Sequence, residues 1–158
     1  MSRWLAAGLT MASLLWVVAL VTAPFGVADG SVAAWLVYHA GGSVCHQRPE
    51  RSFQIAGEQM PVCGRCFGLY LSGAIAAAAA WLTVPGRDAS VDTTRKMLAL
   101  AALPTVVTLA VEWLALAAPS SAVRALAALP LGASAGWIFV RKLRADDPMS
   151  VPRPVDAL

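Results

Sequence analysis

The chain has 158 residues, of which 58% are hydrophobic and 13% are charged. Because this charged share is about half that of an ordinary soluble domain, the composition excludes a soluble fold built on one core. The net charge of +3 is not arranged as a basic stripe interleaved with aromatic residues, so we expect basic membrane loops and no nucleic acid partner. The expected class is an all-α membrane protein with four transmembrane helices, whose main partner is the lipid bilayer.

A first span is predicted over residues 4–22, where an uninterrupted apolar run follows Arg3. The alternative is a secretory signal peptide that ends near Ala23 or Ala28. The apolar run is longer than a typical signal core, the N-terminal charge is weak, and Pro24 directly follows one candidate cleavage site. A retained helix is therefore the preferred interpretation.

A short helix is predicted over residues 31–40. Ser31 is suited to cap its start, and the Gly41-Gly42 pair is expected to end it. The helix is too short to cross a bilayer. We therefore expect it to lie in the membrane interface, with Trp35 and Tyr38 at the depth of the lipid headgroups.

A motif loop over residues 41–66 comes next. It contains a predicted hairpin, in which residues 53–55 and 59–62 flank the turn Ala56-Gly57-Glu58. Three further spans are predicted; they cover residues 67–84, 97–118 and 122–140. The prediction is thus a single membrane domain over residues 1–144, followed by a disordered tail over residues 145–158.

Four spans place both chain ends on one side of the membrane, and the positive-inside rule selects the side. With the ends in the cytoplasm, eight Lys and Arg residues are cytoplasmic: Arg3, Arg87, Arg95, Lys96, Arg141, Lys142, Arg144 and Arg153. Four lie outside: Arg48, Arg51, Arg65 and Arg124. We therefore expect a multi-pass protein of the cell membrane, with both ends inside and the motif loop extracytoplasmic.

The motif loop holds all three cysteines of the chain. Cys63 and Cys66 form a C-x-x-C at the start of a predicted helix, where the helix N-terminus and Arg65 stabilise a thiolate. The hairpin brings Cys45 and His46 toward this pair, so Cys45, His46, Cys63 and Cys66 are predicted to form a Cys₃His zinc site. Adjacent side chains usually point apart, which makes either Cys45 or His46 the weaker ligand.

Two alternatives to a metal site stay open for the cysteines. A C-x-x-C that faces an oxidising compartment can be a redox-active disulfide, with Cys45 as its resolving partner. Quinone-linked disulfide-generating membrane proteins are also four-helix bundles, but they use a second cysteine pair, and no cysteine follows Cys66 here. The third interpretation is an inert disulfide that fixes the loop to the bundle.

Charged residues near the cysteines predict a polar pocket. Arg48 and Arg51 lie in a proline-containing turn, where two guanidinium groups can bind one anion. Glu112 lies deep in the third predicted span, where an ionisable side chain is costly and requires a partner. Arg124, across a short turn, is the expected partner. A structural ion pair and a functional site are equally compatible with this placement.

The motif C-H-Q-x-P-x-R-S, followed by P-V-C-x-R-C-x-G-x-Y-x-x-G, resembles a family of small bacterial and archaeal membrane proteins known as domain of unknown function 2085. The motif residues are Cys45, His46, Gln47, Pro49, Arg51, Ser52, Pro61, Val62, Cys63, Arg65, Cys66, Gly68, Tyr70 and Gly73. The resemblance further implies an acidic residue in the third span, here Glu112 in place of an expected Asp, and a Ser-x-x-Arg element, here Ser121 to Arg124. It implies a shared polar site and no known activity.

The favoured function is a zinc-stabilised membrane module that binds an anionic small molecule or a lipid headgroup. The predicted ligand-binding residues are Gln47, Arg48, Arg51, Ser52, Arg65, Tyr70, Glu112 and Arg124. The alternatives are a membrane thiol-disulfide oxidoreductase and a small transporter or channel subunit, which would have to form a homo-oligomer. No pattern identifies a reaction, so a binding role is preferred to an enzymatic one.

Overall fold

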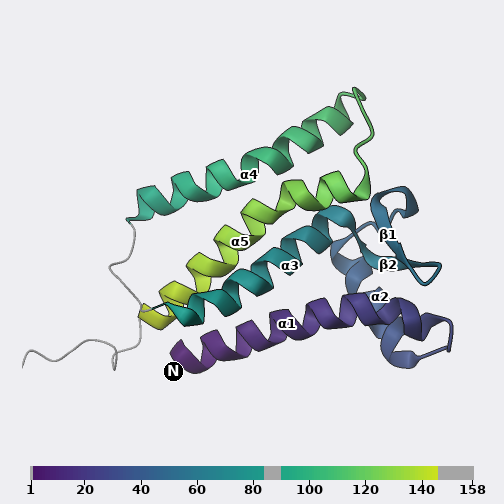
Figure 1. Cartoon of the computed structure of the whole chain (residues 1–158), viewed down its shortest axis with the longest axis horizontal. Helices are drawn as coiled ribbons and strands as arrows, with labels where there is room; N and C mark the ends of the chain where they lie inside the picture. The colour runs from purple at the N-terminus through teal and green to yellow at the C-terminus, as the bar shows by residue number, and fades with distance from the viewer. Residues whose placement is uncertain (1, 84–89, 146–158) are drawn as a thin grey trace, which may run out of the picture.

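The computed structural model describes residues 2–83 and 90–145, and it is mostly helical (Figure 1). Four helical segments are long and apolar enough to cross a membrane; they are Arg3–Val27, Gly64–Leu82, Val91–Trp113 and Ser121–Ala145. This confirms the predicted class of a helical protein with four candidate spans. Residue 145 of the predicted tail (residues 145–158) is helical, as the last residue of Ser121–Ala145. The rest of that tail, residue 84 of the second predicted span and residues 85–89 of the polar loop lie outside the described residues.

Helix α1 (Ser2–Val27) is longer than the predicted span, because it continues through Pro24. The helix ends at Val27, and Gly30 in the turn that follows adopts a left-handed backbone conformation with a φ of 66°. The amides of Gly30 and Ser31 then bond the carbonyls of Val27 and Gly26, both at 3.0 Å. This pattern satisfies the last carbonyls of the helix and reverses the chain.

Helix α2 (Val32–Val44) confirms the predicted cap, since the Ser31 side chain accepts a hydrogen bond from the amide of Ala34. The expected end at Gly41-Gly42 is wrong, because the helix continues through both glycines. Gly41 is buried against the hairpin, and a Cβ at this position would lie 2.5 Å from the carbonyl oxygen of Pro61. The glycine therefore permits close packing of two segments instead of ending the helix.

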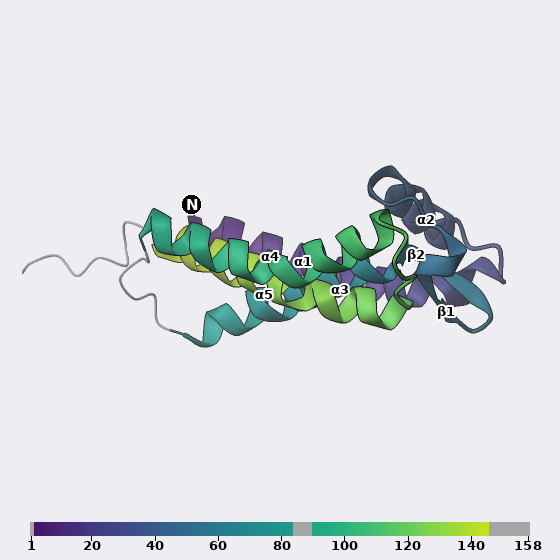
Figure 2. The same cartoon turned by 90° about the horizontal axis from the view of Figure 1, so that it is seen from above.

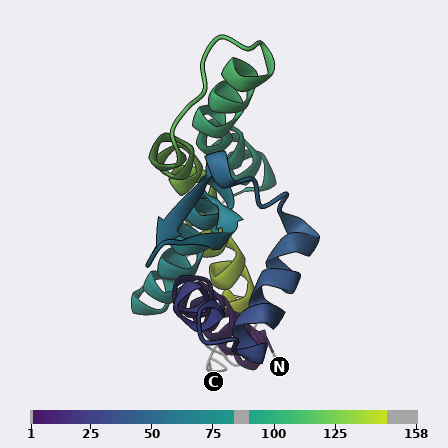
Figure 3. The same cartoon turned by 90° about the vertical axis from the view of Figure 1, so that its right-hand side faces the viewer.

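The predicted hairpin is confirmed as strands β1 (Ser52–Ile55) and β2 (Glu58–Cys63), which pair antiparallel. Its turn residues, Ala56 and Gly57, have φ values of 54° and 83°. Two successive left-handed residues give the turn whose twist matches that of a tight hairpin. Figure 3 shows the hairpin lying across the ends of the helices, with α1 and α4 at opposite edges.

Helix α3 (Gly64–Ala79) and helix α5 (Ser121–Ala145) form the most extensive helix pair. Glycines on both helices bring the backbones together: a Cβ at Gly68 would overlap the carbonyl of Ala125, and one at Gly136 would overlap that of Gly73. In lipid the hydrophobic effect does not drive helices together, so close packing between small residues takes its place. The small residues of the second and fourth predicted spans therefore lie at the contact between α3 and α5.

Helix α4 (Val91–Trp113) starts and ends before the predicted span over residues 97–118. Ala115 takes a left-handed φ of 52°, and the amide of Leu116 bonds the carbonyl of Val111 at 3.1 Å. A left-handed residue after the end of a helix is usually glycine. Because alanine takes this position here, the apolar sequence does not reveal where the helix ends. Helix α4 packs against α5 at the edge of the bundle, and no residue of α4 is fully buried.

The motif loop and the helix ends around it form one end of the molecule. The hairpin, the start of α3, the end of α4 and the start of α5 meet there, whereas the N-terminus lies at the far end (Figures 1 and 2). The sequence predicted that the cysteines and Arg/Glu residues share an end of the bundle, and the described chain places them so.

Candidate metal centre and a neighbouring ion cluster

Three cysteines converge where α2, β2 and α3 meet. Cys45 follows the last residue of α2, Cys63 ends β2 and caps α3, and Cys66 lies in the first turn of α3. Their sulfur atoms all lie within 4.8 Å of one another. The amide of Cys63 donates a hydrogen bond to Cys45 Sγ at 3.2 Å, so the backbone at the start of α3 contacts this sulfur directly.

His46 does not belong to this cluster, and its side chain is exposed. The reason is local: Cys45 has an extended backbone, with φ −139° and ψ 138°. Successive side chains of an extended segment point to opposite sides, so the burial of Cys45 directs His46 outward. Three of the four expected metal ligands are therefore assembled.

The environment of Cys63 favours its thiolate form. A hydrogen bond from the Cys66 thiol, with backbone amides at the start of α3, lowers the pKa of Cys63 to about 5, although partial burial opposes this. A thiolate is the form that binds a metal and the form that attacks a disulfide. The geometry thus supports either chemistry at neutral pH.

Apolar side chains surround the sulfur atoms. Leu20 of α1 and Met60 and Val62 of β2 are buried with Cys45 in one cluster, against which Tyr70 packs. Tyr70 and Cys66 lie four residues apart on α3 and so share a face of the helix. Tyr70 makes an edge-to-face contact with Trp16 of α1, with ring centroids 6.3 Å apart. Tyr70, one of the predicted ligand-binding residues, therefore packs beside the cysteines.

Gln47 fixes the shape of the motif loop. Its side-chain amide donates to the carbonyl of Tyr38 at 2.7 Å and to that of Pro61 at 2.8 Å, which ties α2 to β2. Its backbone is left-handed, with a φ of 48°, and its carbonyl accepts a hydrogen bond from the Gln59 side chain. Gln47 is thus committed to protein contacts, and Gln59, which no sequence motif singles out, is its counterpart in β2.

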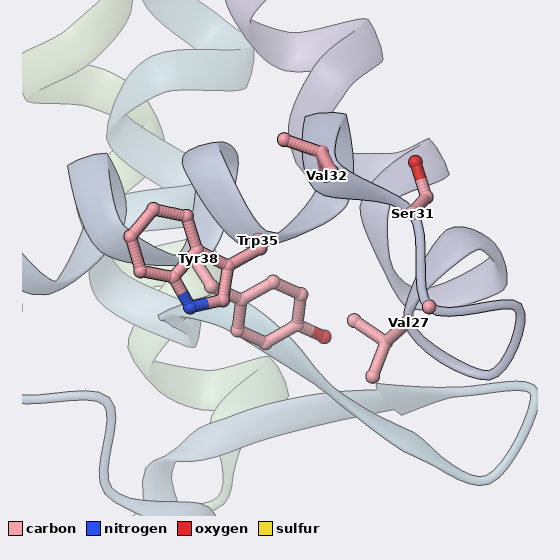
Figure 4. A pocket seen from close by; sticks show the side chains of 6 residues that line it. Val27, Ser31, Val32, Trp35 and Tyr38 are labelled. Carbon is pink, nitrogen blue, oxygen red and sulfur yellow. The ribbon is translucent and has the colours of Figure 1, made fainter.

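A cavity of about 510 Å³ lies beside this loop, where α1 turns into α2 (Figure 4). It is mainly apolar and is lined by Val27, Gly30, Ser31, Val32, Trp35 and Tyr38. The Tyr38 hydroxyl donates to the carbonyl of Gln59. Burial, with the nearby Glu58 carboxylate, raises the pKa of Tyr38, so the hydroxyl keeps its proton for this bond. No predicted site residue lines the cavity.

A second polar group is built around Glu112, whose side chain is only 6% exposed. The predicted pair is present: Arg124 Nε donates to one carboxylate oxygen, and the Arg124 side chain is 4% exposed. Arg65 binds the other oxygen at 3.4 Å and also contacts the hydroxyl of Thr108. Thr108 precedes Glu112 by one helical turn, so the two side chains share a face of α4. This spacing is the sequence feature that indicates Thr108 as part of the group.

The Glu112 group also holds the motif loop. Arg124 donates to the carbonyl of Glu50 at 3.3 Å, and the Ser121 hydroxyl donates to the carbonyl of Ser52 at 3.1 Å. The Ser-x-x-Arg element therefore links α5 to the loop at two points. Ser52 itself is buried, and its hydroxyl donates to the carbonyl of Arg48 at 3.0 Å.

The two polar groups face different helices. Cys66 joins the cluster that packs on α1, whereas Arg65 reaches toward α4. Arg48 and Arg51 remain at the surface, each 4.0 Å from the Glu50 carboxylate, with side chains 57% and 38% exposed. The predicted polar pocket is thus divided into a sulfur site, a buried ion cluster and two exposed arginines.

The family comparison matches residues 45–138, from the first cysteine into α5, to the family described as predicted membrane protein (DUF2085). The chain belongs to this family. The DUF2085 match contains the three cysteines, Glu112 and Arg124. The resemblance drawn from the motif is therefore confirmed.

Two uncharacterized archaeal proteins are similar to short segments of this DUF2085 member. One, from Methanocaldococcus jannaschii, is 50% identical over 40 residues, which are 25% of this chain and 24% of the relative. The other, from Methanothermobacter thermautotrophicus, is 54% identical over 28 residues, which are 18% of this chain and 25% of the relative. The matches span about a quarter of each relative's length. No solved structure matches the chain.

Proposed function

We propose that this protein is a metal-binding membrane protein, in which Cys45, Cys63 and Cys66 hold zinc. The observation that supports this proposal is the approach of the three sulfur atoms to within 4.8 Å of one another. In a tetrahedral zinc site with Zn–S distances of about 2.3 Å, the sulfur atoms lie roughly 3.8 Å apart. Small side-chain rotations are enough to close the remaining gap.

The ligand chemistry favours zinc over other abundant cations. Three thiolates are soft ligands, which Mg²⁺ and Ca²⁺ avoid because they prefer oxygen. The thiolate tendency of Cys63 lowers the proton competition that a metal would meet at neutral pH. Because the ligands come from α2, β2 and α3, bound zinc would fix the motif loop to the start of α3.

The anion-binding part of the proposal falls on Arg48 and Arg51. Arg65 and Arg124 both bind the Glu112 carboxylate, and the Arg65 Nε, which has no partner among the described residues, is itself buried, so neither arginine offers an exposed donor to a further anion. Arg48 and Arg51 are exposed at the end of the bundle, where an anionic lipid headgroup or small molecule would meet them. We place this end on the extracytoplasmic side, on the basis of the positive-inside rule.

The proposal is tested by metal analysis of full-length protein purified in detergent without added metal. We expect about one zinc per chain for the wild type, because three thiolates bind zinc tightly. Cys66→Ser should lose most of the metal. Ser43→Ala, a change at an exposed position outside the site, should retain it. Absence of stoichiometric metal in both wild type and control would exclude the proposal.

A thiol-disulfide oxidoreductase is the second candidate, and the pKa of Cys63 favours it. Cys63 caps α3 and Cys66 follows in its first turn, which is the placement of an attacking and a resolving thiol. Formation of a Cys63–Cys66 disulfide releases two electrons and two protons to an external oxidant. Thiol trapping in intact cells separates the candidates: a mixed population of oxidised and reduced protein supports the redox function, and a uniformly reduced one supports zinc.

A further inference from the structure

The metal centre has three converging protein ligands. Among the His, Cys, Asp and Glu side chains of residues 2–83 and 90–145, only those of the three cysteines meet at this point. His46 is the nearest candidate in sequence, but the extended backbone at Cys45 turns its side chain to the surface. Tetrahedral zinc with three protein ligands keeps its fourth position for water or another exogenous group.

Charge decides which exogenous group fits this position. Three thiolates on Zn²⁺ leave a net charge of −1 at the site. Among the described residues no cationic side chain donates a hydrogen bond to these sulfurs, and Arg65 and Arg124 are bound to Glu112. The surrounding side chains, including Leu20, Met60 and Val62, are apolar. A second negative charge would therefore be costly to place there.

We propose that the metal centre keeps one open coordination position that accepts a neutral donor, such as water or an imidazole or amine nitrogen, and disfavours anions. This inference rests on the proposed metal-binding function. Cys45 is 7% exposed, whereas Cys63 and Cys66 are both partly exposed. A donor therefore reaches the metal from the side of Cys63 and Cys66. Anion binding, where it occurs, belongs to the exposed Arg48 and Arg51 and is separate from the metal.

The test replaces zinc with Co²⁺ in the full-length protein in detergent, because the visible absorption of cobalt reports both thiolate ligands and changes in coordination. Imidazole and azide serve as the neutral and the anionic probe. We expect imidazole to shift the cobalt bands in a saturable way and azide to leave them unchanged at equal concentration. His46→Ala should give the same starting spectrum and the same response to imidazole.

Three results would overturn the inference while leaving metal binding intact. A His46→Ala spectrum that differs from wild type and is restored by imidazole would make His46 the fourth ligand. A wild-type spectrum unaffected by either probe would show a closed site. A saturable shift with azide would show that the position accepts anions. Absence of thiolate-to-cobalt absorption would refute the proposed function itself, and the inference with it.

Discussion

Removal of the Glu112 charge is expected to loosen the end of the bundle. Glu112 is the counterion of two arginines, and the Arg124 side chain is only 4% exposed. Breaking a buried ion pair from one side leaves the other charge without a partner, at a cost of about 3 to 5 kcal/mol. Glu112→Gln should cost about 3 kcal/mol, the lower end of that range, because the amide oxygen still accepts a hydrogen bond.

This cost should appear as reduced resistance to unfolding. The assay is reversible unfolding of the purified protein in mixed micelles with increasing denaturing detergent, followed by tryptophan fluorescence. Asp92→Asn is the matched control: it makes the same chemical change in α4, where Asp92 pairs with Lys96 at 2.7 Å. Both partners are more than 70% exposed, so the control should lose less than about 0.5 kcal/mol. Equal stability of the two variants would refute the reasoning.

Three further predictions concern packing, the thiols and the loop. Gly68→Ala should destabilise the α3–α5 pair by about 1 to 3 kcal/mol, because the new Cβ overlaps a backbone carbonyl. Gly8→Ala is the control: the space around Gly8 is open, so this change should be neutral in the same unfolding assay. Labelling of metal-free Cys63 by a membrane-impermeant thiol reagent, mapped by mass spectrometry, should be nearly constant from pH 6 to 8 and fall below about pH 5, where the thiolate is protonated; a tenfold rise per pH unit above 6 would contradict the assigned pKa. Gln47→Ala should cost about 1 to 3 kcal/mol by removing the two hydrogen bonds that its side chain donates to backbone carbonyls, and an unchanged unfolding midpoint would count against its bridging role.

The broad architecture could be predicted because its signals are local. Apolar runs of spanning length gave the four long helices, and a short turn between two strand-like segments gave the hairpin. The pairing of Glu112 with Arg124 also followed from the sequence, since a short connection joins α4 to α5 and an intramembrane charge requires a partner.

Details that depend on tertiary contacts could not be predicted. The Gly41-Gly42 pair predicts a helix end, but Gly41 is the point where the helix contacts Pro61, which is distant in sequence. Ala115 ends α4 in a conformation that alanine rarely adopts, so composition gives no warning of it. The direction of His46 depends on the backbone conformation of Cys45, which the residue types alone do not determine.

X-ray absorption spectroscopy at the zinc edge of the purified protein tests the central claim most directly. The three-cysteine cluster predicts three sulfur neighbours at about 2.3 Å and one nitrogen or oxygen neighbour at about 2.0 to 2.1 Å. Cys63→Ser should lower the sulfur number, because Cys63 is one of the three converging residues. A zinc shell made only of nitrogen and oxygen, with no sulfur neighbour, would contradict the account.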